Sequence, residues 1–219
     1  YGLPRMASVA EEQGLQPIYG AEMTLLDGAH VLLLARDLSG YRSLCRCITA
    51  AHRSRDRSSP RLAFSDLATN ARGLIALSAC ENGQLHRALM NSGEKAALEV
   101  AGRYRDLLGP DGYYIELHNH LRVEDSRRNA ALQRVAARAG VPVVATNNVH
   151  YATPDRRPLQ DVMTAIRHKS TVAAAGHLLH GNAERYLKPP ETMVRLFDRW
   201  PHAITETRKV ADACQFSLD

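Results

Sequence analysis

Hydrophobic and polar positions follow two alternating periods along most of the chain. Short apolar runs, rich in β-branched residues and bounded by turn-forming residues, predict buried strands. Between them, apolar residues three and four positions apart predict amphipathic helices. The predicted strands cover residues 17–25, 30–35, 73–78, 113–117 and 143–151. Because strands and helices alternate from residue 17 to residue 152, we expect an α/β fold with a parallel sheet or a barrel.

Turn signals and helical periodicity fill in the rest of the pattern. Asp27-Gly28 predicts a hairpin between the first two strands. Ser92-Gly93 is expected to separate two consecutive helices. After Tyr151, prolines divide the chain into short helical pieces, and 169–185 carries the weakest pattern. The predicted helices cover residues 6–13, 40–52, 84–91, 94–108, 127–139, 159–168, 191–198 and 202–216.

Composition describes an ordinary globular chain and excludes some classes. Its 219 residues are 45% hydrophobic, and no apolar run is long enough to span a bilayer. The four cysteines form no CxxC pair, which argues against a zinc knuckle or a thioredoxin motif. Scattered free thiols favour a reducing, cytoplasmic setting.

The charge balance leaves contact with nucleic acid open. The net charge is +5 and the pI is about 9.2. A basic surface of this size suits nucleic acid, and a solvated basic surface explains it equally well. The basic loop 53–60 has the same two interpretations: contact with phosphates or simple solvation.

Potential ligand side chains gather at the predicted strand ends. Asn148 and His150 lie two residues apart, so a strand would project them from one face. Cys80 follows another buried strand, and Glu22 lies inside the first one, where a carboxylate is costly unless it is paired or bound to a metal. His52 falls in the last turn of a helix that can point the same way.

Carboxylate, thiolate and imidazole together suit zinc or a similar transition ion. Each residue also has a purely structural interpretation: Glu22 facing water, Cys80 as a buried filler, His52 complementing a helix dipole and His150 as a capping group. His118 and His120 form an H-x-H pair on one strand face, which alone is weak support for a metal. From these residues, a metal site and a coincidence both remain open.

Five sequence blocks, in order, resemble the PHP (polymerase and histidinol phosphatase) domain of bacterial DNA polymerase III alpha subunits. The likeness is nearest to the error-prone, damage-induced branch, and it extends through Lys188-Pro189-Pro190 to the last predicted helix. The blocks are residues 17–22 (PIYGAE), 30–36 (HVLLLAR), 40–45 (GYRSLC), 73–80 (GLIALSAC) and 145–151 (ATNNVHY).

For the fold, the resemblance implies a distorted (βα)7 barrel that is incomplete at its N-terminus. Residues 1–168 would form this barrel, and residues 169–219 would form a loop and a helical segment leading toward a polymerase palm. The chain starts at Tyr1 with no initiator Met, so we expect an internal piece of a longer protein. The first ligand motifs of the family would then lie upstream of Tyr1, and the catalytic aspartates of the polymerase would lie beyond Asp219.

For the site, the resemblance implies a centre that holds up to three metal ions, zinc or manganese, and supports 3′–5′ exonuclease hydrolysis in intact members. His120 does not match a family ligand. At Asn148 the intact pattern has an aspartate, and a neutral amide is expected to weaken metal binding. The site is therefore expected to be degenerate. The residues that match the family's metal ligands are Glu22, His52, Cys80, Asn148 and His150.

For function, the resemblance implies a fragment of an error-prone DNA-directed DNA polymerase acting in replication, repair and translesion synthesis. Such a parent would use DNA, deoxynucleoside triphosphates and magnesium, would act in the cytoplasm away from membranes, and would contact a sliding clamp and mutagenesis accessory proteins. Two alternatives remain: a free-standing PHP metallo-phosphoesterase, and a metal-free module that stabilises a polymerase or docks a partner.

Overall fold

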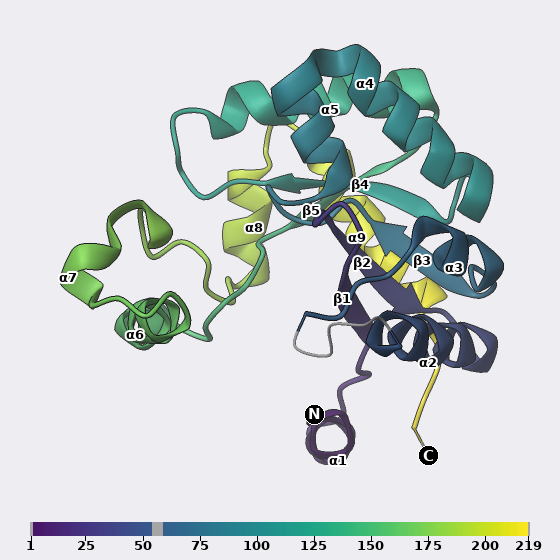
Figure 1. The fold of residues 1–219 in the computed structure, drawn as a ribbon, viewed down its shortest axis with the longest axis horizontal. Coiled ribbons are helices and arrows are strands. Elements are labelled where there is room, and N and C mark those ends of the chain that lie inside the picture. The colour runs from purple at the N-terminus through teal and green to yellow at the C-terminus, as the bar shows by residue number, and fades with distance from the viewer. Residues whose placement is uncertain (1, 54–58, 219) are drawn as a thin grey trace.

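A single mixed sheet organises the protein (Figure 1). The computed structural model describes residues 2–53 and 59–218, so most of the basic loop lies outside the described residues. The described strands adjoin in sequence order, β1-β2-β3-β4-β5, and all five predicted strands are present, although the last ends at Thr146 and not at residue 151. Their bounds are β1 Gly20–Thr24, β2 His30–Ala35, β3 Leu74–Leu77, β4 Tyr113–His118 and β5 Val143–Thr146.

The direction of strand pairing changes across the sheet. β1 and β3 both run antiparallel to β2, whereas β3, β4 and β5 run parallel. The expectation of a parallel sheet is therefore right for the pairings of β4 with β3 and β5, and wrong for the pairings of β2 with β1 and β3. The Asp27-Gly28 turn, as predicted, reverses the chain between β1 and β2. The last residue of β2, Ala35, pairs with the first residue of β3, Leu74. The connection between the two strands therefore brings the chain back to the end of β2, and β3 then runs antiparallel to it.

A close glycine contact fixes this return point. Gly40 lies in the first turn of α2 (Leu38–His52), where the Asp37 side chain caps the helix by accepting the Gly40 N–H at 2.8 Å. A Cβ atom built on Gly40 would lie 2.0 Å from the carbonyl oxygen of Gly73. Only glycine allows α2 to approach the start of β3 this closely.

Helices cover both faces of the sheet, and the predicted helical segments are confirmed. Gly93 has φ 83° and ψ −175° and breaks the fourth helix where Ser92-Gly93 predicted a separation. In the described residues the remaining helices are α1 Leu3–Glu12, α3 Phe64–Thr69, α4 Gln84–Leu108, α5 Asp125–Ala139, α6 Arg157–Arg167, α7 Val172–Ala175, α8 Pro190–Leu196 and α9 Pro201–Ala213, with 3-10 turns at Pro154–Arg156 and Gly176–Leu178. None of the helices described is both long and apolar enough to cross a membrane.

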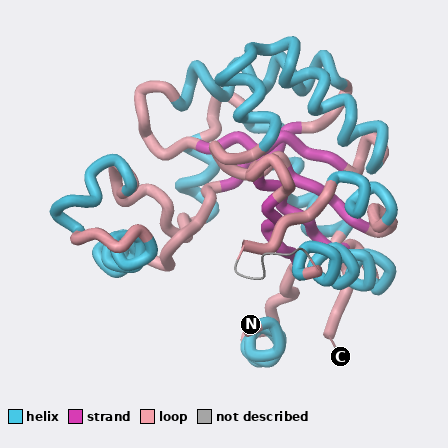
Figure 2. The backbone as a smooth tube through the Cα atoms, viewed as in Figure 1, coloured by secondary structure: helices cyan, strands magenta, loops and turns pink. Residues whose placement is uncertain are grey.

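The core lies mainly on the face covered by α2, α4 and α5 (Figure 2). Leu33, Ile115 and Leu117 point to this face and are fully buried. On the opposite face a smaller cluster joins Tyr114 and Val144 to Val210 of α9. Because side chains alternate along a strand, Glu116 and His118 share this second face with Tyr114. The second face is therefore apolar toward α9 and polar toward the carboxyl ends of β4 and β5.

Candidate metal centre

Glu22, His30 and Cys80 bring three different ligand atoms together at one point. The ligand atoms all lie within 4.8 Å of one another. His30 Nδ1 lies 3.2 Å from Glu22 Oε1 and 3.8 Å from Cys80 Sγ. In the part of the chain that the structure describes, this is the one group of three or more such side chains with this spacing. Three protein ligands with room for a water or substrate is the arrangement of catalytic zinc sites.

Strand pairing places Glu22 beside His30. Thr24 pairs directly with His30, and Glu22 pairs with Leu32, so all four side chains share one face of the β1–β2 hairpin. The side chain of Glu22 is 49% exposed. The cost of burying a carboxylate, which singled out this residue in the sequence, therefore does not apply. Its proximity to His30 and Cys80 gives the better reason to consider it a ligand.

The loop after β3 places Cys80. Ala79 has a φ of 63°, and the backbone N–H of His30 donates to Asn82 O at 3.0 Å, so this loop is tied to the start of β2. A Cβ atom at Gly83 would lie 2.0 Å from Ser78 O, so the turn closes only with glycine there. The hairpin and the loop thus hold the carboxylate, imidazole and thiol in a fixed relation.

Electrostatics keep the Cys80 thiol protonated when no cation is bound. Burial raises its pKa; the Asn82 N–H opposes this, and the nearby carboxylates of Glu22, Glu81 and Glu116 add to the rise. A divalent cation beside these groups reverses the balance, because a coordinating thiol loses its proton. The donor set therefore suits a transition metal, and binding should release a proton.

Four of the five predicted site residues line one cleft of about 570 Å³, and His30 lines it too. The four are Glu22, Cys80, Asn148 and His150. His52, the fifth, is exposed in the last turn of α2 and is not among the residues that line the cleft. Sequence reasoning missed His30, although the Asp27-Gly28 hairpin carries the signal: its register sets His30 across from Thr24, two residues from Glu22.

Asn148 and His150 come from a loop and not from the strand end that the sequence predicts. β5 stops at Thr146 because Asn147 turns inward, where its side chain donates to Glu184 O at 2.9 Å and Tyr186 O at 2.6 Å. Asn148 then adopts a φ of 41°, a conformation that asparagine tolerates. The ring of His150 lies edge-on to that of His180, with centroids 4.9 Å apart.

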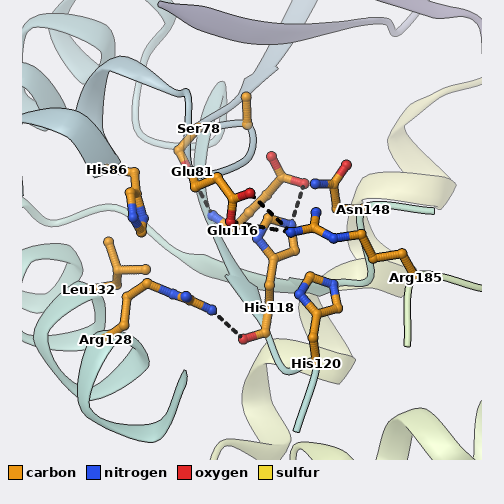
Figure 3. A pocket seen from close by; sticks show the side chains of 11 residues that line it. Ser78, Glu81, His86, Glu116, His118, His120, Arg128, Leu132, Asn148 and Arg185 are labelled. Atoms are coloured by element: carbon orange, nitrogen blue, oxygen red, sulfur yellow. Dashed lines mark hydrogen bonds and ion pairs between the residues drawn. The ribbon is translucent and has the colours of Figure 1, made fainter. Parts of the chain in front are cut away.

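A second layer of polar groups lies beneath the cleft (Figure 3). Glu116 accepts a hydrogen bond from Thr146 at 2.8 Å and lies 3.7 Å from His118 Nε2. The rings of His118 and His120 stack with centroids 5.7 Å apart, as expected for an H-x-H pair on one face. His120 Nε2 donates to Asn147 O at 3.0 Å, and burial lowers the His120 pKa to about 4, so its imidazole is neutral near pH 7.

Comparison with known protein families shows which family this chain belongs to. The PHP domain profile matches residues 1–120. The chain belongs to the PHP domain family. Of the candidate ligands, Glu22, His30, His52 and Cys80 fall within the matched part of this PHP domain, whereas Asn148 and His150 lie beyond it.

Three curated relatives of this PHP domain carry the name error-prone DNA polymerase. Identity is 35% over 234 aligned residues with the Symbiobacterium thermophilum protein, covering 100% of this chain and 22% of the relative. It is 38% over 215 residues with the Brucella abortus protein (96% and 19%). With the Pseudomonas fluorescens protein it is 37% over 218 residues (99% and 20%). The chain thus spans about a fifth of the length of these relatives.

Proposed function

We propose that this chain is the PHP-domain part of an error-prone DNA-directed DNA polymerase. Similarity to proteins of that name along 96–100% of the chain supports the proposal. The five described strands would then be part of a distorted (βα)7 barrel, and residues 169–219 would lead toward the palm. The catalytic aspartates of polymerisation would lie outside this chain.

The remaining expectations for the parent protein follow from the same proposal. Its substrates would be DNA and deoxynucleoside triphosphates, with magnesium as the polymerase cofactor. A sliding clamp and mutagenesis accessory proteins would be its partners, and the cytoplasm its location.

For this domain itself we propose a metal centre that binds zinc or manganese and has little or no hydrolytic activity. The single observation behind it is the convergence of Glu22, His30 and Cys80. A bound divalent ion would supply a water of lowered pKa and polarise a phosphoester. The protein would contribute a carboxylate, an imidazole and a thiolate on one side of the cleft, with His150 and the neutral Asn148 also lining it. An amide in place of a carboxylate leaves one negative charge fewer to hold cations.

The test is the metal content of the full-length protein that contains this chain, purified without chelator and measured by elemental analysis, alongside primer extension. We expect primer extension, bound zinc or manganese, and higher metal occupancy in Asn148→Asp. No metal in either form would overturn the metal centre and favour a structural or docking module. Hydrolysis of small phosphate esters without primer extension would overturn the polymerase assignment and favour a free-standing phosphoesterase.

A further inference from the structure

Arg185 is a buried cation at the boundary between the cleft and the polar layer beneath it. Its side chain is 4% exposed, and it lines both cavities. Its backbone carbonyl accepts the His150 N–H at 2.8 Å, which fixes the chain at this point. Figure 3 shows the side chain extending between Asn148 and His120 toward Glu81.

Most of the guanidinium's hydrogen-bonding capacity is unused. Nη2 donates to Glu81 Oε1 and Oε2 at 3.1 and 3.2 Å. The hydrogen bonds from this guanidinium to the described residues all leave from Nη2, so Nε and Nη1 remain available. A guanidinium carries five N–H donors in a planar fork, and Nε and Nη1 are not among the fully buried atoms without a partner in the described residues, so they reach the cavities that Arg185 lines. The structure therefore holds a preoriented cation that lacks acceptors.

The surroundings favour an anion as the missing acceptor. Arg122 and Arg167 border the same cleft, where the carboxylates are those of Glu22 and Glu81. A bound metal at Glu22 would make the cleft still more positive.

We propose that Arg185 binds a phosphate group of a nucleic-acid strand in this cleft, beside the metal centre. Nε–H and Nη1–H point to different sides of the guanidinium, so one of them would donate a charge-assisted hydrogen bond to a phosphate oxygen while Nη2 stays with Glu81. Arg167 would attract the strand at the rim, where Arg122 is already paired with Glu124 at 2.5 Å. This assignment rests on the proposed function, because it names the ligand class of the same cleft.

Replacement of Glu81 distinguishes a phosphate-binding Arg185 from an Arg185 that only forms a structural ion pair. Its carboxylate neutralises Arg185 and repels an incoming phosphate, and its side chain is 44% exposed, so it has access to solvent. Glu81→Gln keeps an acceptor for Nη2 and removes the negative charge. Phosphate affinity should therefore rise in Glu81→Gln and fall in Arg185→Gln. A merely structural ion pair would instead weaken binding in both variants.

Hydrogen exchange with mass spectrometry on the full-length protein can localise binding to peptides spanning 177–187. The probes are inorganic phosphate, thymidine monophosphate and a short oligo(dT), each added after chelation of metal. With oligo(dT) we expect protection of these peptides, at least about tenfold weaker in Arg185→Gln and severalfold tighter in Glu81→Gln. The exposed Arg195, which bonds Thr192 on α8, provides a matched control: Arg195→Gln should bind like the unaltered protein.

Protection by thymidine monophosphate alone would identify a nucleotide as the source of the phosphate and overturn the strand. Protection by inorganic phosphate alone would likewise overturn the strand, and protection by none of the probes would overturn the site. Thermal midpoints show whether each variant is folded. If Arg185→Gln unfolds, the double variant Arg185→Gln/Glu81→Gln removes the unpaired carboxylate and should fold without binding. Primer extension and metal content are measured separately, so a failed polymerase assignment is distinguished from a failed phosphate site.

Discussion

His30 Nδ1 lies 3.2 Å from Glu22 Oε1, on the same face of the first hairpin. The two residues are eight positions apart in the sequence, and the Asp27-Gly28 turn and the antiparallel register bring their side chains together. This pair, with Cys80, defines the candidate metal centre.

Replacement of His30 tests the ligand set directly. Losing one of three ligands in His30→Ala should lower zinc affinity by at least about tenfold, because even the groups that only support a ligand carry tenfold or larger effects. Competition with a fluorescent chelator measures this. The exposed His202, which contacts Gln133 on the surface, serves as control.

His52→Ala in the same assay decides between two ligand sets. The family resemblance predicts a loss of affinity, whereas the position of His52 on α2 outside the cleft predicts none. Unchanged affinity in His30→Ala together with a loss in His52→Ala would contradict the centre described here.

Stability should fall in mild acid, partly because of His86. Burial lowers the pKa of His86 from 6.5 to about 4, and Arg128 adds to this. The folded state therefore holds the imidazole neutral, while the unfolded chain takes up a proton below about pH 6.5. The stability contributed by the neutral form is complete above that pH and is lost as pH falls toward 4.

The loss attributable to His86 is on the order of 1–2 kcal/mol, discounted for its partial exposure. Denaturant unfolding of His86→Gln at neutral and acid pH checks this. The variant should lose less stability on acidification than the unaltered protein. An equal loss in both would show that other groups, such as His120 and His180, account for the acid response.

Two glycine-to-alanine changes should have opposite signs. Gly40→Ala forces a Cβ to 2.0 Å from the Gly73 carbonyl and should destabilise the protein, by about 1–3 kcal/mol as for other overpacked sites. Gly102, inside α4, has open space where a Cβ atom would lie. Gly102→Ala should stabilise by up to about 1 kcal/mol through helix propensity. Thermal or urea unfolding measures both, and a stabilising Gly40→Ala would contradict the close contact between α2 and β3.

The centre of the sheet should be intolerant of cavities. Ile115 in β4 is fully buried, so Ile115→Ala should cost about 2–5 kcal/mol of unfolding free energy. Ile166 in α6 is 70% exposed, and Ile166→Ala should change stability by no more than about 0.5 kcal/mol. Comparable losses in the two variants would mean that Ile166 is buried in the intact protein.

The sequence predicted the strands and helices well because each carries its own local period. The direction of strand pairing was harder to predict, because a nearly all-apolar strand such as residues 30–35 has the same hydrophobic pattern in a parallel and in an antiparallel sheet. Its partner is set by where α2 returns the chain, which depends on the Gly40–Gly73 contact. Local pattern therefore identified the elements, and long-range packing decided how they pair.

The candidate site was predicted in the same partial way. Residue type and strand-end position brought Glu22, Cys80, Asn148 and His150 to one cleft. Prediction of His30 as a site residue would have required the hairpin register. Prediction of the buried Arg185 would have required knowing that residues 184–187 lie beside the end of β5. The inward turn of Asn147 also could not be read from sequence, because its acceptors are backbone carbonyls distant along the chain.

The hydrogen bond between His150 N and Arg185 O joins two parts of the chain that are distant in sequence. Together with the bridge between Tyr151 and Tyr186, it joins the two ends of the segment 152–184, so that this segment leaves and re-enters the fold at one place. α6 and α7 lie within it, apart from the sheet (Figure 1). Replacement or lengthening of this segment would therefore alter the cleft-lining residues that it contributes and leave Glu22, His30 and Cys80 in place.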